Sequence, residues 1–117
     1  MGDRVALLKR LYEAFNRKDL DVLLASAHPE IDWPDFVSGG RIKGREALRE
    51  YWTHQFGLVD PDATPIEFRE LPDGRIWVKL HYLIRAVGGG IWADEIRTNT
   101  VRFRDGLVDR MDWDEAP

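Results

Sequence analysis

Cysteine is absent from the 117 residues, which excludes disulfide bonds, thiolate nucleophiles and cysteine-based metal sites. Apolar runs of transmembrane length are also absent, and charges interrupt the N-terminal MGDRVALLKR, so we expect no signal peptide. The formal net charge is −4, and no basic stripe or polybasic run indicates nucleic acid or a membrane surface. We therefore expect a cytoplasmic protein with no nucleic-acid or membrane partner.

Aromatic side chains are abundant, with five Trp, three Tyr and five Phe. Aromatic residues bury large areas and often line ligand cavities. The hydrophobic content of 44% is ordinary for a folded chain, and the length fits a single domain over residues 1–117. The composition therefore indicates one globular domain with enough aromatic surface to enclose a small molecule.

The spacing of apolar residues predicts helices in the first half of the chain and strands in the second. Helical periodicity covers about residues 3–17, Leu20–Ala27 and Arg45–Phe56, with His28-Pro29 and Gly57 as stop signals. Alternation and turn signals predict strands at Ile31–Trp33, Pro61–Leu71, Arg75–Val87, Ile91–Gly106 (ending in a tight turn) and Leu107–Trp113. This order indicates an α+β fold, a cone-shaped barrel in which three N-terminal helices pack on a curved antiparallel sheet.

The strand that begins at Ile91 has two different faces, because successive side chains point to opposite sides. One face changes from apolar to polar along Phe103, Val101, Asn99, Arg97 and Glu95, which is typical of a pocket wall. On the opposite side of this strand and the preceding one we expect an apolar surface outside the cone, formed by Trp77, Leu83, Trp92 and Ile96. An exposed apolar sheet face normally has a partner, so we expect a homodimer through it.

Four segments, in order along nearly the whole chain, resemble the signatures of one family. They are LYEAFNRKDL at 11–20, HPEI followed by WP at 28–34, GREALREYW at 44–52 and FRDGLV at 103–108. Together they are similar to the SnoaL-like branch of the nuclear transport factor 2-like superfamily. The resemblance implies a curved sheet around a conical cavity, often in a homodimer built on the outer sheet face. Members include polyketide cyclases, ketosteroid isomerase, scytalone dehydratase and limonene epoxide hydrolase, which use acid–base chemistry on small apolar molecules, generally without a metal.

The catalytic positions of those relatives carry different residues here. The resemblance places Leu11 at the helix-one tyrosine of ketosteroid isomerase, Trp33 at its basic aspartate and Asn99 at its protonated aspartate. Trp113 stands where the SnoaL-type cyclases carry an aspartate on the last strand. None of these mechanisms transfers intact.

Asp35 and Asn99 are the candidate catalytic residues. Asp35 is expected at the pocket rim, where Trp33, Phe36 and Trp52 would desolvate it and suit it to acid or base work; the alternative is a solvated turn aspartate. Asn99 would donate a hydrogen bond to a ligand carbonyl or developing oxyanion; the alternative is a structural amide.

Further residues are candidates for ligand binding. Tyr12 and Tyr82 are expected to hydrogen-bond a ligand or pack in the core, and Glu95 and Arg97 to pair at the pocket mouth or hold an anionic group. Trp33, Trp52, Met111 and Trp113 are expected to line the cavity, although such residues are also common in plain cores.

Two functions stay open on this basis. One is a cofactor-free isomerase, cyclase, lyase or dehydratase acting on a small hydrophobic carbonyl compound, with Asp35 moving the proton and Asn99 stabilising the enolate oxygen. The other is a non-catalytic module that binds a small hydrophobic molecule. The three histidines lack metal-ligand spacing, and we expect neither a metal nor a cofactor.

Overall fold

The computed structural model describes residues 2–35 and 38–114, and in these residues the chain forms three helices and six strands. The elements in order are α1 (Gly2–Arg17), α2 (Leu20–Ala25), β1 (Ala27–Pro34), β2 (Arg41–Lys43), α3 (Arg45–Leu58), β3 (Val59–Glu70), β4 (Ile76–Ala86), β5 (Ile91–Arg104) and β6 (Leu107–Trp113). None of the helices in the described residues is long and apolar enough to cross a membrane.

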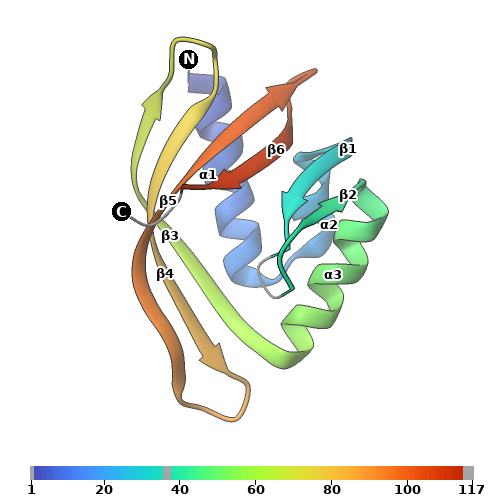
Figure 1. Cartoon of the computed structure of the whole chain (residues 1–117), viewed down its shortest axis with the longest axis vertical. Coiled ribbons are helices and arrows are strands. Elements are labelled where there is room, and N and C mark those ends of the chain that lie inside the picture. The colour runs from blue at the N-terminus through green and yellow to red at the C-terminus, as the bar shows by residue number, and fades with distance from the viewer. Residues whose placement is uncertain (1, 36–37, 115–117) are drawn as a thin grey trace.

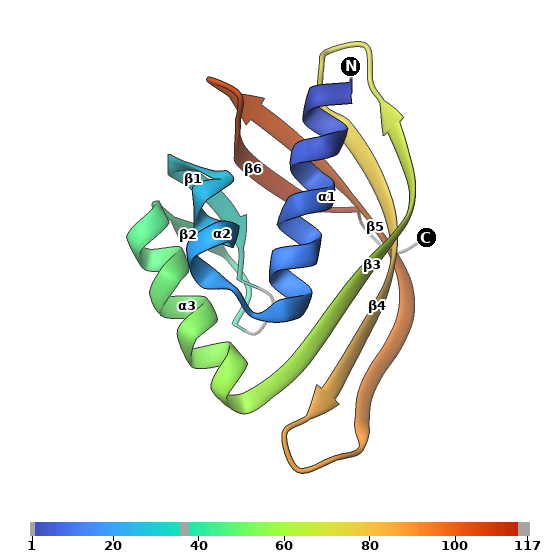
Figure 2. The same cartoon turned by 180° about the vertical axis from the view of Figure 1, so that it is seen from behind.

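The strands form one sheet in the order β2-β1-β6-β5-β4-β3. β1 and β6 pair in parallel and the other neighbours are antiparallel, so the sheet is mixed rather than purely antiparallel. It curves around α1, with α3 beside the opening of the curve (Figure 1). Seen from behind, α1 lies inside the concave face and the β4–β5 hairpin extends past the end of α3 (Figure 2). The predicted α+β fold is confirmed.

The Asn16 side chain links α1 to β3, the strand at one edge of the sheet, through two hydrogen bonds. Asn16 donates through Nδ2 to the carbonyl oxygen of Ala63 at 3.0 Å and accepts through Oδ1 from the Ala63 amide at 2.8 Å. β3 is an edge strand, which is why it tolerates Pro61 and Pro65. The Asn16 side chain satisfies part of that edge and positions α1 over the concave face.

Element boundaries differ from the prediction near two stop signals. The second helix ends at Ala25, and His28-Pro29 lies inside β1. Pairing of β1 with β6 is irregular between Ala27 and Asp32, so the missing amide of Pro29 removes no regular ladder bond. Gly57 does not end α3, which continues to Leu58. The sequence patterns also missed β2, whose three residues are too short to show alternation.

Trp92 does not lie on the outer sheet face as predicted. The β4–β5 register steps from Ile84↔Ala93 to Arg85↔Ile91, which leaves Trp92 as the extra residue of a bulge. A bulge interrupts the two-residue alternation and redirects the side chain. Trp92 therefore lines the cavity on the concave side, although 68% of its surface is exposed.

Candidate functional site

The concave face of the sheet and the helices enclose a cavity made of two adjoining chambers. The outer one, which we call the mouth chamber, has a volume of about 230 Å³. Its lining is almost wholly apolar: Phe15, Tyr51, Trp52, Gln55, Phe56, Val59, Pro61, Tyr82, Ile84 and Trp92. A space of this kind suits the apolar body of a small molecule.

The inner chamber lies deeper and has a volume of only about 40 Å³. It is lined by Leu11, Tyr12, Phe15, Trp33, Pro34, Tyr51, Trp52, Ala63, Leu80, Tyr82, Asn99, Met111 and Trp113. Phe15, Tyr51, Trp52 and Tyr82 line both chambers, so the two chambers adjoin. The inner chamber has room for a small polar group and not for a ring.

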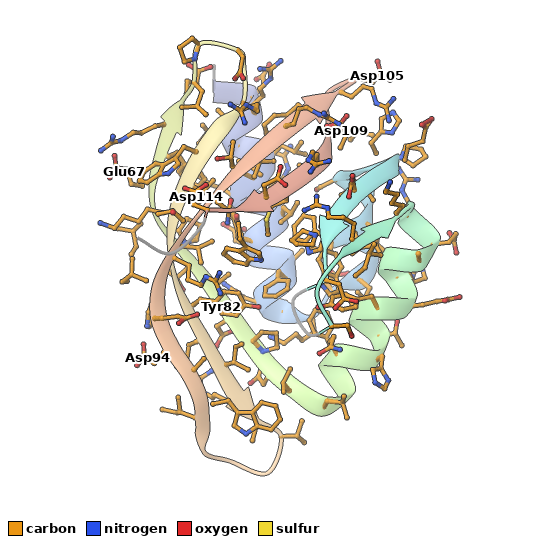
Figure 3. All side chains as sticks on the ribbon, in the orientation of Figure 1. Glu67, Tyr82, Asp94, Asp105, Asp109 and Asp114 are labelled. Carbon is orange, nitrogen blue, oxygen red and sulfur yellow. The ribbon has the colours of Figure 1, made fainter. Side chains whose placement is uncertain are left out.

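Packed aromatic rings make the inner chamber narrow. Trp33 meets Trp52 edge-on with ring centroids 5.1 Å apart, and Trp52 stacks on Phe56 at 6.4 Å. Across the cavity Tyr82 contacts Trp113 at 5.5 Å. Figure 3 shows Tyr82 between the sheet and the helices, whereas Asp94 lies on the outer side of the sheet. The indole rings of Trp33, Trp52 and Trp113 therefore occupy much of the conical cavity. They leave the narrow inner chamber, which Tyr12 and Asn99 also line.

Tyr12 and Asn99 form the polar pair in the inner chamber. Asn99 is fully buried on β5, and its Nδ2 donates a hydrogen bond to the Tyr12 hydroxyl oxygen at 3.3 Å. Among the described residues, the Oδ1 atom of Asn99 has no hydrogen-bond partner. The hydroxyl that contacts Asn99 therefore belongs to Tyr12, one residue after Leu11, which the sequence resemblance had placed at the tyrosine position. The pair leaves the Asn99 Oδ1 atom as an unused acceptor in an apolar space.

Burial keeps the cavity tyrosines protonated. Desolvation raises the pKa of Tyr12 to about 12, and the hydrogen bond from Asn99 opposes this shift. Desolvation likewise raises the pKa of Tyr82, with the negative charge of Glu95 adding to the rise and Arg97 opposing it. Among the described residues that line the two chambers, the titratable side chains are Tyr12, Tyr51 and Tyr82. Of these, Tyr12 and Tyr82 can donate hydrogen bonds at neutral pH but do not serve as bases there.

Asp35 lies in the turn after β1. Its Oδ1 accepts a hydrogen bond from the Ser38 amide at 2.9 Å, and its own amide donates to the Gly40 carbonyl oxygen at 3.1 Å. Pro34, the residue before it, lines the inner chamber, whereas Asp35 is not among the described residues that do so. Phe36, expected beside it, lies outside the described residues. These contacts are those of a turn aspartate, and the role of base stays a prediction.

Glu95 and Arg97 pair with each other, with Arg97 Nη1 at 3.3 Å from Glu95 Oε1. The Arg97 guanidinium also stacks on Trp113, 4.5 Å from the ring centroid. Neither residue is among the described side chains that line the chambers. Arg97 therefore affects the site indirectly, because its guanidinium packs against the Trp113 ring that lines the inner chamber.

The carboxylate next to Trp113 turns away from the cavity. Asp112 Oδ2 accepts from Arg110 Nε at 2.8 Å, and Asp112 Oδ1 accepts from Arg41 Nη1 at 3.1 Å. The hydrogen bond from Arg110 and the nearby positive charges hold the pKa of Asp112 below its usual value of 3.8. Asp112 is therefore an ionised member of a surface network. No group of three or more metal-ligating side chains occurs in the described residues.

Most of the predicted site residues come together in the inner chamber: Tyr12, Trp33, Trp52, Tyr82, Asn99, Met111 and Trp113. The sequence interpretation did not assign the mouth chamber. The predicted helices and strands contain Phe15, Tyr51, Phe56 and Ile84, but local periodicity does not show that these residues lie around one chamber. Trp92 was missed because the bulge has no signal in the alternation.

The profile of the SnoaL-like domain matches residues 8–111. This chain belongs to the SnoaL-like domain family. Its SnoaL-like domain is similar in structure to a nuclear transport factor 2-like protein of unknown function from Burkholderia pseudomallei, with 27% identity, a TM-score of 0.83, and coverage of 97% of this chain and 91% of the other. The resemblance seen in the sequence is thereby confirmed.

Two further solved structures share the fold of this SnoaL-like domain and hold small molecules. TerC, co-crystallised with polyporic acid, is 22% identical with a TM-score of 0.81, covering 95% of this chain and 89% of the other. A Mycobacterium tuberculosis protein in complex with estradiol-17β-hemisuccinate is 18% identical with a TM-score of 0.82, covering 95% and 92%. No curated protein matches this SnoaL-like domain.

Proposed function

We propose that this SnoaL-like domain binds a small, largely apolar molecule in the two-chamber cavity, with the ligand body in the mouth chamber and a polar end in the inner chamber. The observation that carries the proposal is the continuous apolar lining that ends at the buried Tyr12–Asn99 pair. A concave apolar site with few convergent polar groups is the usual form of a ligand pocket.

The small molecules held by two relatives of the same fold support this proposal. Polyporic acid and estradiol-17β-hemisuccinate are bound by TerC and by the Mycobacterium tuberculosis protein, respectively. Identities of 22% and 18% support a shared fold and do not extend to the individual residues of the cavity. We take from these complexes the class of ligand, a small organic molecule, and not its identity.

Filling the mouth chamber tests the proposal. Ile84 lines the mouth chamber, so Ile84→Trp should occupy its space and abolish the binding of β-methylnaphthalene measured by isothermal titration calorimetry. Arg85→Trp is the matched control, because the next residue of β4 lies on the outer face and should leave binding unchanged. Equal binding by the wild type and Ile84→Trp, or no binding of any apolar probe by the wild type, would overturn the proposal.

An acid–base enzyme is the second candidate function. The observation in its favour is that the Tyr12 hydroxyl, which accepts from Asn99, keeps its own proton for a ligand carbonyl, while Asp35 directly follows the cavity-lining Pro34. Turnover of a cyclic ketone, monitored by solvent deuterium incorporation, should then be lost in both Asp35→Asn and Asn99→Leu while probe binding persists. If the wild type exchanges no deuterium into any member of a carbonyl library, this candidate is lost.

The homodimer and the cytoplasmic location expected from the sequence stay predictions. Of the apolar residues assigned to the outer face, Ile96 is 55% exposed, whereas Trp77 is half-buried and its Nε1 donates to Asp114 Oδ2 at 3.1 Å. Ile96 is therefore the residue through which we expect a second copy to bind most strongly.

A further inference from the structure

We infer that the buried end of the ligand is a hydroxyl group, of an alcohol or a phenol, that accepts a hydrogen bond from Tyr12 and donates one to the Oδ1 atom of Asn99. This inference rests on the proposed function and specifies the ligand class of the same cavity. It departs from the expectation of a carbonyl ligand with which the sequence interpretation began.

Asn99 has one hydrogen-bonding function in use and one unused acceptor. Its side chain is fully buried on β5, opposite Val78 of β4, and lines the inner chamber. Nδ2 donates to Tyr12 at 3.3 Å, whereas Oδ1 accepts no hydrogen bond from the described residues. A buried amide oxygen is costly to leave without a donor, so a ligand that supplies one gains affinity at this atom.

Tyr12 has the complementary unused function. Its hydroxyl oxygen accepts from Asn99, and the contacts of the described residues give its proton no acceptor. Tyr12 is 6% exposed, and its hydroxyl stays protonated at neutral pH because burial disfavours the phenolate. The inner chamber therefore offers the Tyr12 proton as a donor beside the unpartnered Oδ1 acceptor of Asn99.

A single hydroxyl group matches both functions within the available space. The inner chamber, at about 40 Å³, has room for a small group, and both Tyr12 and Asn99 line it. A hydroxyl oxygen accepts from Tyr12 and its proton goes to Asn99 Oδ1. A ketone or ether oxygen accepts from Tyr12 as well, but it sets its own lone pairs against those of Asn99 and leaves the amide oxygen unpaired.

Charged ligand ends fit the inner chamber poorly. A carboxylate would face the amide oxygen of Asn99 with like partial charge, and an ammonium would lose its water without gaining a carboxylate partner among the described lining residues. A neutral hydroxyl avoids both costs.

Matched naphthalene probes test the inference in the full-length protein. β-Naphthol, its methyl ether and β-methylnaphthalene share one ring system and differ in offering a donor and acceptor, an acceptor only, or neither. By isothermal titration calorimetry we expect the wild type to bind β-naphthol about tenfold more tightly than either comparator. Apolar burial alone would favour β-methylnaphthalene, so this preference has the opposite sign to a purely hydrophobic one.

Variants locate the preference. Asn99→Leu should remove it by lowering only the affinity for β-naphthol, and Tyr12→Phe should reduce it. Trp92→Ala, in the mouth chamber, should weaken all three probes and keep their ratio. If Asn99→Leu does not fold, the ratios of the three probe affinities in the wild type and in Tyr12→Phe still test the inference.

The possible failures are distinguishable. Equal binding of the three probes by the wild type overturns the hydroxyl inference, assigns the pair to a buried water, and leaves the cavity proposal standing. A preference that persists in Asn99→Leu overturns the inference as well. Absence of binding for every probe overturns both the cavity proposal and the inference.

Discussion

At the scale of residues, Asn99 and Tyr12 show how a polar pair is built into an aromatic core. Leu11 and Tyr12 both belong to the buried stripe of α1, and only the rotation of that helix decides which of the two meets β5. The tyrosine meets it, and its hydroxyl contacts Asn99 at 3.3 Å. A polar pair placed among Trp33, Trp52 and Trp113 is the feature of this cavity that gives it a preferred ligand chemistry.

The raised pKa of Tyr12 predicts a loss of stability at alkaline pH. In the unfolded chain the Tyr12 phenol has its usual pKa of 10.0, whereas in the folded protein burial raises this pKa to about 12. Between these values the unfolded state releases a proton that the folded state keeps, so the free energy of unfolding falls by about 1.4 kcal/mol per pH unit for this group. Below pH 10 this contribution does not change with pH.

Urea unfolding of the wild type and Tyr12→Phe across this range measures the effect. The wild type should lose stability more steeply above pH 10 than Tyr12→Phe, and part of the remaining slope belongs to Tyr82, whose pKa is also raised by burial. Parallel pH profiles of the two proteins would contradict the prediction.

At the scale of elements, α3 and the β4–β5 hairpin decide the shape of the mouth chamber. α3 contributes Tyr51, Trp52, Gln55 and Phe56 to its lining. The helix continues through Gly57 to Leu58 and leads directly into β3, whose Val59 and Pro61 also line the chamber. The hairpin contributes Trp92 through its bulge.

Two glycines of α3 should respond oppositely to alanine. Gly44, at the N-cap, has a φ of +94°, a conformation that L side chains rarely adopt, so Gly44→Ala should lower the free energy of unfolding by more than about 1 kcal/mol. Gly57 is helical with open space around it, so Gly57→Ala should raise that free energy by about 1 kcal/mol. Chemical denaturation of both variants checks the pair, and a stabilising Gly44→Ala would refute this account of the cap.

The bulge predicts a ligand role for an exposed tryptophan. Trp92 is 68% exposed and lines the mouth chamber, so Trp92→Ala should weaken binding of β-methylnaphthalene several-fold, by about 1 kcal/mol, with little change in unfolding temperature. Ile96→Ala is the control, since Ile96 lies on β5 opposite His81 on the outer face and should leave binding unchanged. If both variants bind as the wild type does, Trp92 does not contact the ligand.

At the scale of the whole molecule, the sheet has one face closed by helices and one face open. The concave side holds the core and the cavity, and the outer side mixes charged side chains with Ile96, Leu83 and Trp77. Exposed apolar residues that cluster on one face often mark an interface, and this is the basis of the dimer prediction.

We expect the wild type to elute as a homodimer and Ile96→Glu to elute as a monomer in size-exclusion chromatography with light scattering. The buried carboxylate would lose its water without a partner, which disfavours association. Trp77→Glu should act in the same direction, and Glu13→Lys, on the exposed side of α1, should stay dimeric. A wild type that already elutes as a monomer would end the dimer hypothesis.

The sequence by itself determined the α+β class, the helix faces and the inward side of β4 and β5, because each depends on a local period of apolar residues. It also brought Asn99, Tyr12 and the three tryptophans Trp33, Trp52 and Trp113 into one candidate site. The fold class and the faces need only neighbours along the chain and the order of the elements, whereas the grouping of the site residues also depended on the resemblance to SnoaL-like proteins.

Only the tertiary structure decided which atoms of that site remain available. The irregular stretch in the pairing of β1 with β6 lets β1 contain Pro29, the bulge turns Trp92 into the mouth chamber, and the helix rotation sets Tyr12 against Asn99. Register and helix rotation arise from contacts between residues far apart in the chain, and local patterns do not carry them. The unused oxygen of Asn99, on which the proposed ligand chemistry rests, exists only once those contacts are made.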